Sequence, residues 1–122
     1  MYPYTMTVSS FLSGSPSEYL STTIMAQVGT ERRFSIYVHS GQSNLTVAIS
    51  GGIGDADLYV KYGELPSYAS YDCRPYKWGN NERCSFHHQY AGTWYIMVYA
   101  YSNYSGVTLT AGESNGAGID IT

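Results

Sequence analysis

Asp55 and Asp57 are the acidic residues of this chain whose spacing is best suited to metal binding or acid–base catalysis. They lie two positions apart in the segment GDADLYV, so on a strand both would point to one face. Such a pair can hold Ca²⁺ or act as an acid and a base. The alternative, which we prefer, is structural: Asp55 closes a turn after Gly54, and Asp57 accepts hydrogen bonds from loop amides.

The three histidines, His39, His87 and His88, do not have a spacing typical of a metal site. The adjacent pair would point to opposite faces of a strand, so both cannot readily reach one ion. The HExxH motif of zinc proteases and the glycine motif of phosphate-binding loops are absent from the sequence. We therefore predict no catalytic residues, no metal ligands and no cofactor, and expect a binding or spacer module.

Cys73 and Cys84 flank the loop-like segment RPYKWGNNER. The ends of such a loop can come within disulfide distance, and closing it stabilises a fold by about 3 kcal/mol in the chain-entropy model. A reactive or metal-binding pair is the rival interpretation, but zinc would need four ligands and the spacing is not CxxC. We predict a disulfide and, with it, an oxidising compartment.

The uncharged segment TWYIMVYAY, residues 93–101, is the best candidate for a binding surface. Alternation along a strand places its aliphatic residues and Trp94 in the core, and we expect the opposite face to form an exposed row about 20 Å long. Contiguous exposed aromatic patches often mark interaction sites. The alternatives are that a loop or residues 1–18 cover this face, or that its rings form cross-strand ladders. The outward row, here called the tyrosine stripe, consists of Tyr95, Met97, Tyr99 and Tyr101.

The elements that must position these residues are β-strands. Hydrophobic residues alternate with period two, segments rich in Gly, Pro, Asn and Ser separate the runs, and no window of 11 or more residues has a helical stripe. We predict an all-β, antiparallel, jelly-roll-like sandwich in a single domain. An N-terminal segment is expected at 1–18, the sandwich at 19–111 and a flexible tail at 112–122. The predicted strands are 19–26, 34–40, 44–50, 56–62, 84–88, 93–101 and 107–111.

The composition suits an extracellular β-domain. The chain has 122 residues, which corresponds to one domain, and its charged share of 12% is about half of that typical of soluble domains. Six Lys and Arg residues and a net charge of -3 leave no basic patch for nucleic acid. No stretch approaches the ~20 apolar residues of a membrane span, and residues 1–4 do not resemble a signal peptide. We expect a secreted part of a longer protein, without nucleic-acid or membrane partners.

Five short motifs stand out along the chain: GDADLYV at 54–60, YDCRPY at 71–76, GNNERC at 79–84, AGTWY at 91–95 and YSNYSG at 101–106. Together they resemble the bacterial pre-peptidase C-terminal domain, a module that follows the catalytic domain in many secreted metalloproteases and subtilisin-like proteases. The resemblance covers about residues 10–112. It implies a jelly-roll-like β-sandwich with a non-catalytic accessory role, and it supports the Cys73–Cys84 bridge.

The aromatic strand is also similar to the collagen-binding domains of bacterial collagenases, whose pattern GxYYLLVYxYS aligns with GTWYIMVYAYS at 92–102. This likeness implies that the tyrosine stripe faces collagen, with Tyr59 and Tyr71 contributing from neighbouring segments. Clostridial relatives carry an acidic calcium-binding linker, whereas residues 1–19 here offer only Glu18, so we do not predict that calcium site.

The resemblance therefore predicts a monomeric domain that binds collagen or gelatin and recruits the catalytic domain of the same polypeptide to its substrate. Two other functions remain open at this point. In the first, the domain assists secretion or folding of the parent protease and is later removed. Flat aromatic strips also stack on sugars, so a carbohydrate-binding sandwich is the third interpretation, with Trp78 as the exposed ring.

Overall fold

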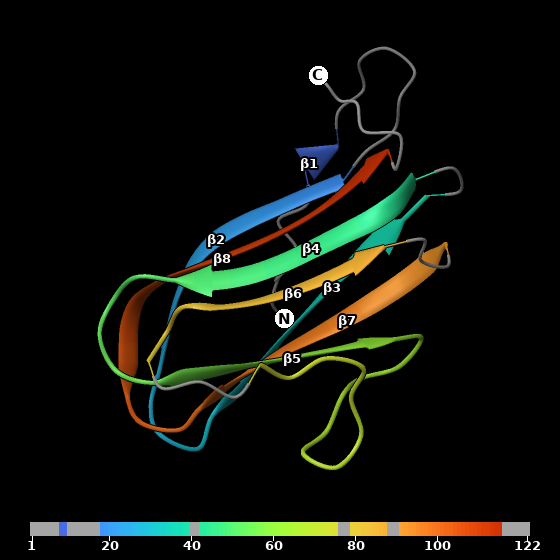
Figure 1. The fold of residues 1–122 in the computed structure, drawn as a ribbon. Coiled ribbons are helices and arrows are strands. Elements are labelled where there is room, and N and C mark those ends of the chain that lie inside the picture. Colours follow the sequence, from blue (N-terminus) through green and yellow to red (C-terminus); the bar gives the residue numbers. More distant parts are fainter. Residues whose placement is uncertain (1–7, 10–17, 40–41, 76–78, 88–90, 116–122) are drawn as a thin grey trace.

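The computed structural model describes residues 8–9, 18–39, 42–75, 79–87 and 91–115, and all its regular elements are strands (Figure 1). No helix long and apolar enough to cross a membrane occurs among these residues. The strands are β1 (Val8–Ser9), β2 (Glu18–Ala26), β3 (Glu31–Val38), β4 (Gln42–Ser50), β5 (Ala56–Tyr62), β6 (Glu82–His87), β7 (Gly92–Ala100) and β8 (Tyr104–Asn115).

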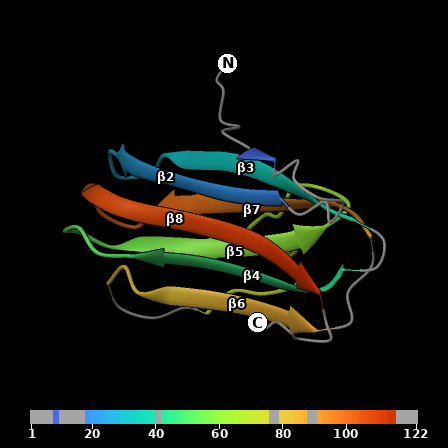
Figure 2. The ribbon, with the colours of Figure 1, turned by 90° about the horizontal axis from the view of Figure 1, so that it is seen from above.

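The strands form two antiparallel sheets, one of five strands in the order β1-β2-β8-β4-β6 and one of three in the order β3-β7-β5. From β2 to β8, consecutive strands alternate between the two sheets, so every connection crosses from one layer to the other. Seen from above, the strands of both layers run along the same long axis (Figure 2). The predicted antiparallel sandwich is confirmed, whereas the jelly-roll description stays a prediction.

The core lies between the sheets and is built from the residues that alternation assigns to the inner face. In β7, Trp94, Ile96 and Val98 are at most 2% exposed and belong to one cluster with the inward residues of the other strands. Burying a large aliphatic side chain contributes about 1.5–3 kcal/mol. This burial sets the register, because a shift by one residue would turn the apolar set outward.

Two boundaries differ from the predicted ones. Strand β8 continues to Asn115, so the first four residues of the predicted tail at 112–122 belong to a strand, and residues 116–122 lie outside the described part of the chain. The extension pairs with β4, where Leu45 lies opposite Glu113. The short strand β1 falls within the predicted N-terminal segment and pairs with the start of β2. Alternation missed these segments because both contain few aliphatic residues.

The sandwich has two distinct ends. Strand β2 begins and strand β8 ends at the same end, because Tyr19 pairs with Gly112. The opposite end is formed by the turns 27–30, 51–55 and 101–103, which lie on the left in Figure 1. These three turns are joined to one another by backbone hydrogen bonds, including Gly29 N to Ala100 O and Tyr101 N to Asp55 O.

Candidate binding surface

The tyrosine stripe lies on the outer face of the three-stranded sheet, as alternation predicts, but it is not an open row. Met97 is only 1% exposed, and Tyr59, its partner in the register with β5, is 2% exposed. The expectation that these two side chains form accessible surface is therefore wrong. Tyr95 and Tyr99 are half-buried, and Tyr101 in the following turn is 59% exposed.

The connection that follows β5, residues 63–75, covers the middle of this face (Figure 1, yellow-green). The ring centroid of Tyr68 lies 5.1 Å from that of Tyr99 and 6.0 Å from that of Tyr59. The ring of Tyr71 lies 5.8 Å from that of Tyr59. All three contacts are edge-to-face, the arrangement that aromatic pairs favour. The structure therefore agrees with the alternative in which a loop covers the outer face.

The loop is fastened to the sandwich at several points. The predicted disulfide is confirmed: Cys73 and Cys84 are bonded, with their Cα atoms 6.0 Å apart. The Val60 amide donates to the Cys73 carbonyl at 3.0 Å, and the Tyr62 amide donates to Asp72 Oδ2 at 2.8 Å. These bonds satisfy amides on the open edge of β5, which would otherwise invite pairing with another strand. The loop is thus part of the folded domain.

Tyr68 is also held at its hydroxyl, which donates to Glu31 Oε2 at 2.6 Å across the sheet. This hydrogen bond, followed by burial, raises the pKa of Tyr68 to about 12. The hydrogen bond to Glu31 helps to hold the Tyr68 ring against the sheet. Sequence reasoning missed Tyr68, because alternation within strands does not indicate where a loop folds.

Tyr59, Tyr68, Tyr71 and Tyr99 form what we call the aromatic cluster. The guanidinium carbon of Arg74 lies 5.1 Å from the ring centroid of Tyr59 and 6.0 Å from that of Tyr71, within the range of cation–π attraction. Tyr68 is 50% exposed and Tyr71 is 41% exposed. The accessible aromatic surface is therefore carried by the loop and by Tyr101, while Tyr59 supports it from below.

The predicted carboxylate pair lies beside this cluster and is mostly buried. Asp57 is 6% exposed. Burial, followed by repulsion from Asp55, raises the pKa of Asp57 to about 6, although Arg74 opposes the shift. Glu82 accepts a 2.7 Å hydrogen bond from the Leu58 amide on the edge of β5. No group of three or more His, Cys, Asp or Glu side chains is placed to hold a metal ion within the described ranges.

Two of the three histidines can be placed, and they lie in separate contacts. His39 Nδ1 is 2.6 Å from Glu113 Oε2, and the His39 amide donates to the other oxygen of the same carboxylate at 2.6 Å. His87 Nδ1 is 3.2 Å from Asn44 Oδ1. His88 lies outside the described residues. The two placed histidines therefore serve local hydrogen bonds at different points of the sandwich.

The segment GESNG at 112–116 matches the GxSxG pattern that surrounds the nucleophile of many hydrolases. That pattern needs a sharp strand-to-helix turn, whereas residues 112–115 continue strand β8. The side chain of Glu113 in this segment is fully buried and is bonded to His39. The match therefore lies on a strand as far as Asn115, and Gly116 lies outside the described residues.

Three relatives show what this chain is similar to. It is 53% identical over 75 residues to a neutral protease of Vibrio proteolyticus, covering 62% of this chain and 12% of the relative. It is 48% identical over 90 residues to an extracellular protease of Xanthomonas campestris, covering 74% of this chain and 15% of the relative. A microbial collagenase of Vibrio vulnificus is 30% identical over 96 residues, covering 75% of this chain and 12% of that enzyme. The chain thus spans a small part of each protease.

The solved structures and the family model agree with these relatives. The solution structure of vEP C-ter 100 is similar with a TM-score of 0.62 and 45% identity, covering 75% of this chain and 88% of that one. The model of the bacterial pre-peptidase C-terminal domain matches residues 30–100, which include β3 to β7 and the aromatic cluster. The chain therefore belongs to the bacterial pre-peptidase C-terminal domain family.

Proposed function

We propose that this domain is a non-catalytic accessory part of a secreted bacterial protease and that it recruits the enzyme to collagen or gelatin. The observation that carries the proposal is the accessible part of the aromatic surface, Tyr68, Tyr71 and Tyr101, which is mounted on a disulfide-fastened loop and a hydrogen-bonded turn. Rigid rings lose little conformational entropy on binding, and aromatic residues are enriched at the energetic centres of interfaces.

The chemistry of this surface fits a rod-like chain rich in proline and glycine. Tyrosine ring faces pack against the imino-acid rings of the ligand, and phenolic hydroxyls bond to its solvated carbonyls. Charged residues make up only 12% of the chain, so long-range electrostatic attraction contributes little. Binding should be of modest affinity, because one small surface buries limited area, and should change little with salt.

The comparisons with known proteins support the accessory role and, more weakly, collagen as the ligand. The similar regions make up 12% to 15% of the three proteases, so the greater part of each enzyme lies outside the region shared with this chain. Secretion is supported by the name of the Xanthomonas relative, an extracellular protease, and by the disulfide. Collagen as the ligand is supported by similarity to the Vibrio vulnificus collagenase.

The test is a binding assay of the chain on insoluble collagen, gelatin, chitin and cellulose. Tyr101→Ala is expected to weaken collagen binding about tenfold, the loss typical of an exposed ring at the centre of an interface. Tyr37→Ala is the matched control, because Tyr37 is 45% exposed on the same sheet but lies at the opposite end of β3 from Glu31 and the aromatic cluster. Equal binding by both variants would contradict the proposal.

The same assay separates the other candidate functions. Binding to chitin or cellulose but not to collagen would favour the carbohydrate interpretation, for which the predicted ring, Trp78, lies outside the described residues. Absence of binding to every polymer would favour a domain that assists folding or secretion of the parent protease. In that case secretion of the protease should fall when the domain is deleted.

A further inference from the structure

Tyr68 belongs to the loop after β5, but its position is set by a residue of another strand. Glu31, the first residue of β3, accepts a hydrogen bond from the Tyr68 hydroxyl on Oε2 at 2.6 Å. Strands β3 and β5 lie at the two edges of the three-stranded sheet, with β7 between them. The Tyr68 side chain therefore reaches across the sheet to its acceptor.

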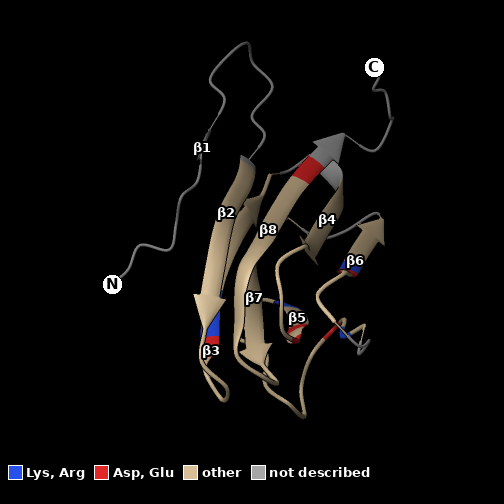
Figure 3. Cartoon of the chain, turned by 90° about the vertical axis from the view of Figure 1, so that its left-hand side faces the viewer, with Lys and Arg blue, Asp and Glu red and all other residues tan. Residues whose placement is uncertain are grey.

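The carboxylate of Glu31 is itself held in place. Arg33 lies two positions further along β3, on the same face of the strand, and its Nη2 donates to Glu31 Oε1. The other oxygen, Oε2, is thereby left for Tyr68. Figure 3 shows acidic and basic residues next to each other at the start of β3. The side chain of Glu31 is only 27% exposed, so it is an acceptor with a fixed position.

The ring of Tyr68 is fixed at the same place as its hydroxyl. Glu31 lies opposite Tyr99 in the register of β3 and β7, and the ring centroid of Tyr68 is 5.1 Å from that of Tyr99. Ser67 and Ser70 close the tip of the loop with two backbone hydrogen bonds to each other, at 2.8 and 3.1 Å. The ring contacts hold one side of Tyr68 and the hydroxyl bond holds its end. Together they specify how the exposed half of the ring is presented.

The bond to Glu31 also decides what Tyr68 can offer a ligand. A phenol has one hydrogen to donate, and Tyr68 donates it within the domain. The ligand therefore meets the exposed part of the ring, which is 50% accessible as a side chain, and not a free donor. An exposed aromatic ring packs well against the ring of proline. This position of the surface therefore suits an imino acid better than a backbone carbonyl.

We propose that Glu31 is a positioning residue of the collagen-binding surface: through the Tyr68 hydroxyl it holds this ring in the orientation in which an imino-acid ring of the ligand packs against it. The inference rests on the proposed function. It assigns a role in binding to a side chain that acts through Tyr68 and not by touching the ligand. Without Glu31 the ring has to be ordered when the ligand binds, which weakens binding about fivefold, the usual cost of immobilising one side chain.

The test is a double-mutant cycle on fibrillar collagen with the wild-type chain, Glu31→Ala, Tyr68→Phe and the variant that carries both changes. Each single change breaks the same hydrogen bond, so each should weaken binding about fivefold. The double variant should also bind about fivefold more weakly, and not about 25-fold, because the second change has nothing left to break. Glu31→Gln keeps an acceptor oxygen and should bind nearly as well as wild type.

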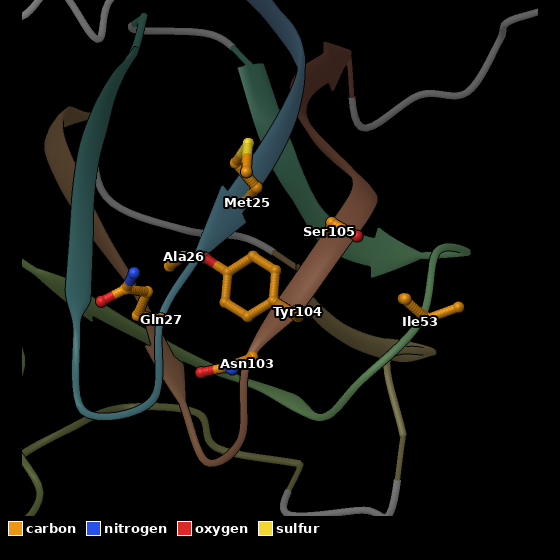
Figure 4. Close-up of a pocket in the computed structure, with 7 residues that line it drawn as sticks. All are labelled: Met25, Ala26, Gln27, Ile53, Asn103, Tyr104 and Ser105. Atoms are coloured by element: carbon orange, nitrogen blue, oxygen red, sulfur yellow. The ribbon is translucent and has the colours of Figure 1, made fainter.

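Two control variants change exposed side chains of the other sheet. Tyr19→Phe removes the hydroxyl of a ring that is 51% exposed on β2. Met25→Thr shortens a side chain that is 66% exposed near Tyr104 (Figure 4). Both positions belong to the five-stranded sheet, so both variants should bind like wild type. The melting temperature of every variant should stay within a few degrees of wild type, because a bond at the surface contributes little to stability.

A second measurement follows the ring directly, in the absence of collagen. Relaxation of the Tyr68 ring carbons, measured by NMR, reports the amplitude of ring motion on the fast timescale. We expect this amplitude to be larger in Glu31→Ala than in wild type and to be unchanged in Glu31→Gln. A residue that only stabilised the fold would not alter the order of one ring in this way.

The outcomes distinguish this inference from the proposed function. If the effects of the two single changes multiply in the double variant, Glu31 acts independently of Tyr68, and the inference is overturned while the proposed function stands. Wild-type binding by Tyr68→Phe, or unchanged motion of the Tyr68 ring in Glu31→Ala, would overturn it in the same way. If the wild-type chain does not bind collagen, the proposed function and the inference are both overturned.

Discussion

Asp57 makes the stability of this domain depend on pH in a direction opposite to that of most carboxylates. Its pKa is raised from 3.8 to about 6, mainly by burial. The folded state therefore keeps a proton that the unfolded state has already lost between these two pH values. Stability from this group is fully present below pH 3.8 and is lost as the pH rises through about 6.

The size of the effect follows from the shift. A difference of about two pH units at 1.36 kcal/mol each amounts to about 3 kcal/mol in the free energy of unfolding. Asp57→Asn replaces the carboxyl by a neutral group of the same shape, so the variant escapes this loss. Relative to wild type, we expect Asp57→Asn to have similar stability near pH 4 and to be about 3 kcal/mol more stable at pH 7.

Urea unfolding at both pH values, followed by tyrosine and tryptophan fluorescence, measures the difference. Glu64→Gln is the control, because the side chain of Glu64 is 71% exposed and such surface carboxylates change stability by less than about 1 kcal/mol. A gap between Asp57→Asn and wild type that does not grow from pH 4 to pH 7 would refute the reasoning, since the raised pKa of Asp57 is its basis.

Two further predictions concern buried groups. Cys73→Ser/Cys84→Ser should lower the free energy of unfolding by about 3 kcal/mol, because the bridge closes a short loop. Urea unfolding of the oxidised wild type and of the variant measures this difference. Equal unfolding midpoints would contradict the prediction. Tyr104→Phe should raise the melting temperature by a few degrees, about 1 kcal/mol, since the Tyr104 hydroxyl is buried without a hydrogen-bond partner among the described residues. A lower melting temperature would show that this hydroxyl is bonded in solution.

Local pattern determined which face of each strand enters the core. In β7, the alternation of Ile96 and Val98 with Tyr95 and Tyr99 could be recognised without knowing any neighbour, because side chains of a strand point to opposite faces. The pairing of Cys73 with Cys84 was also predictable, since two cysteines allow one bridge and the intervening segment is rich in turn residues. These features depend on residues close together in the chain.

Exposure, in contrast, was decided by tertiary structure. Alternation placed Met97 and Tyr59 correctly outside the core, yet both are buried, because the loop 63–75 returns over them. That path depends on contacts between distant residues, such as the hydrogen bond from Tyr68 to Glu31 across 37 positions. The end of the sandwich opposite the start of β2 likewise forms only because the turns 27–30, 51–55 and 101–103 meet. Periodicity determines the face on which a side chain lies, but only the packing of remote segments determines whether solvent or a ligand can reach it.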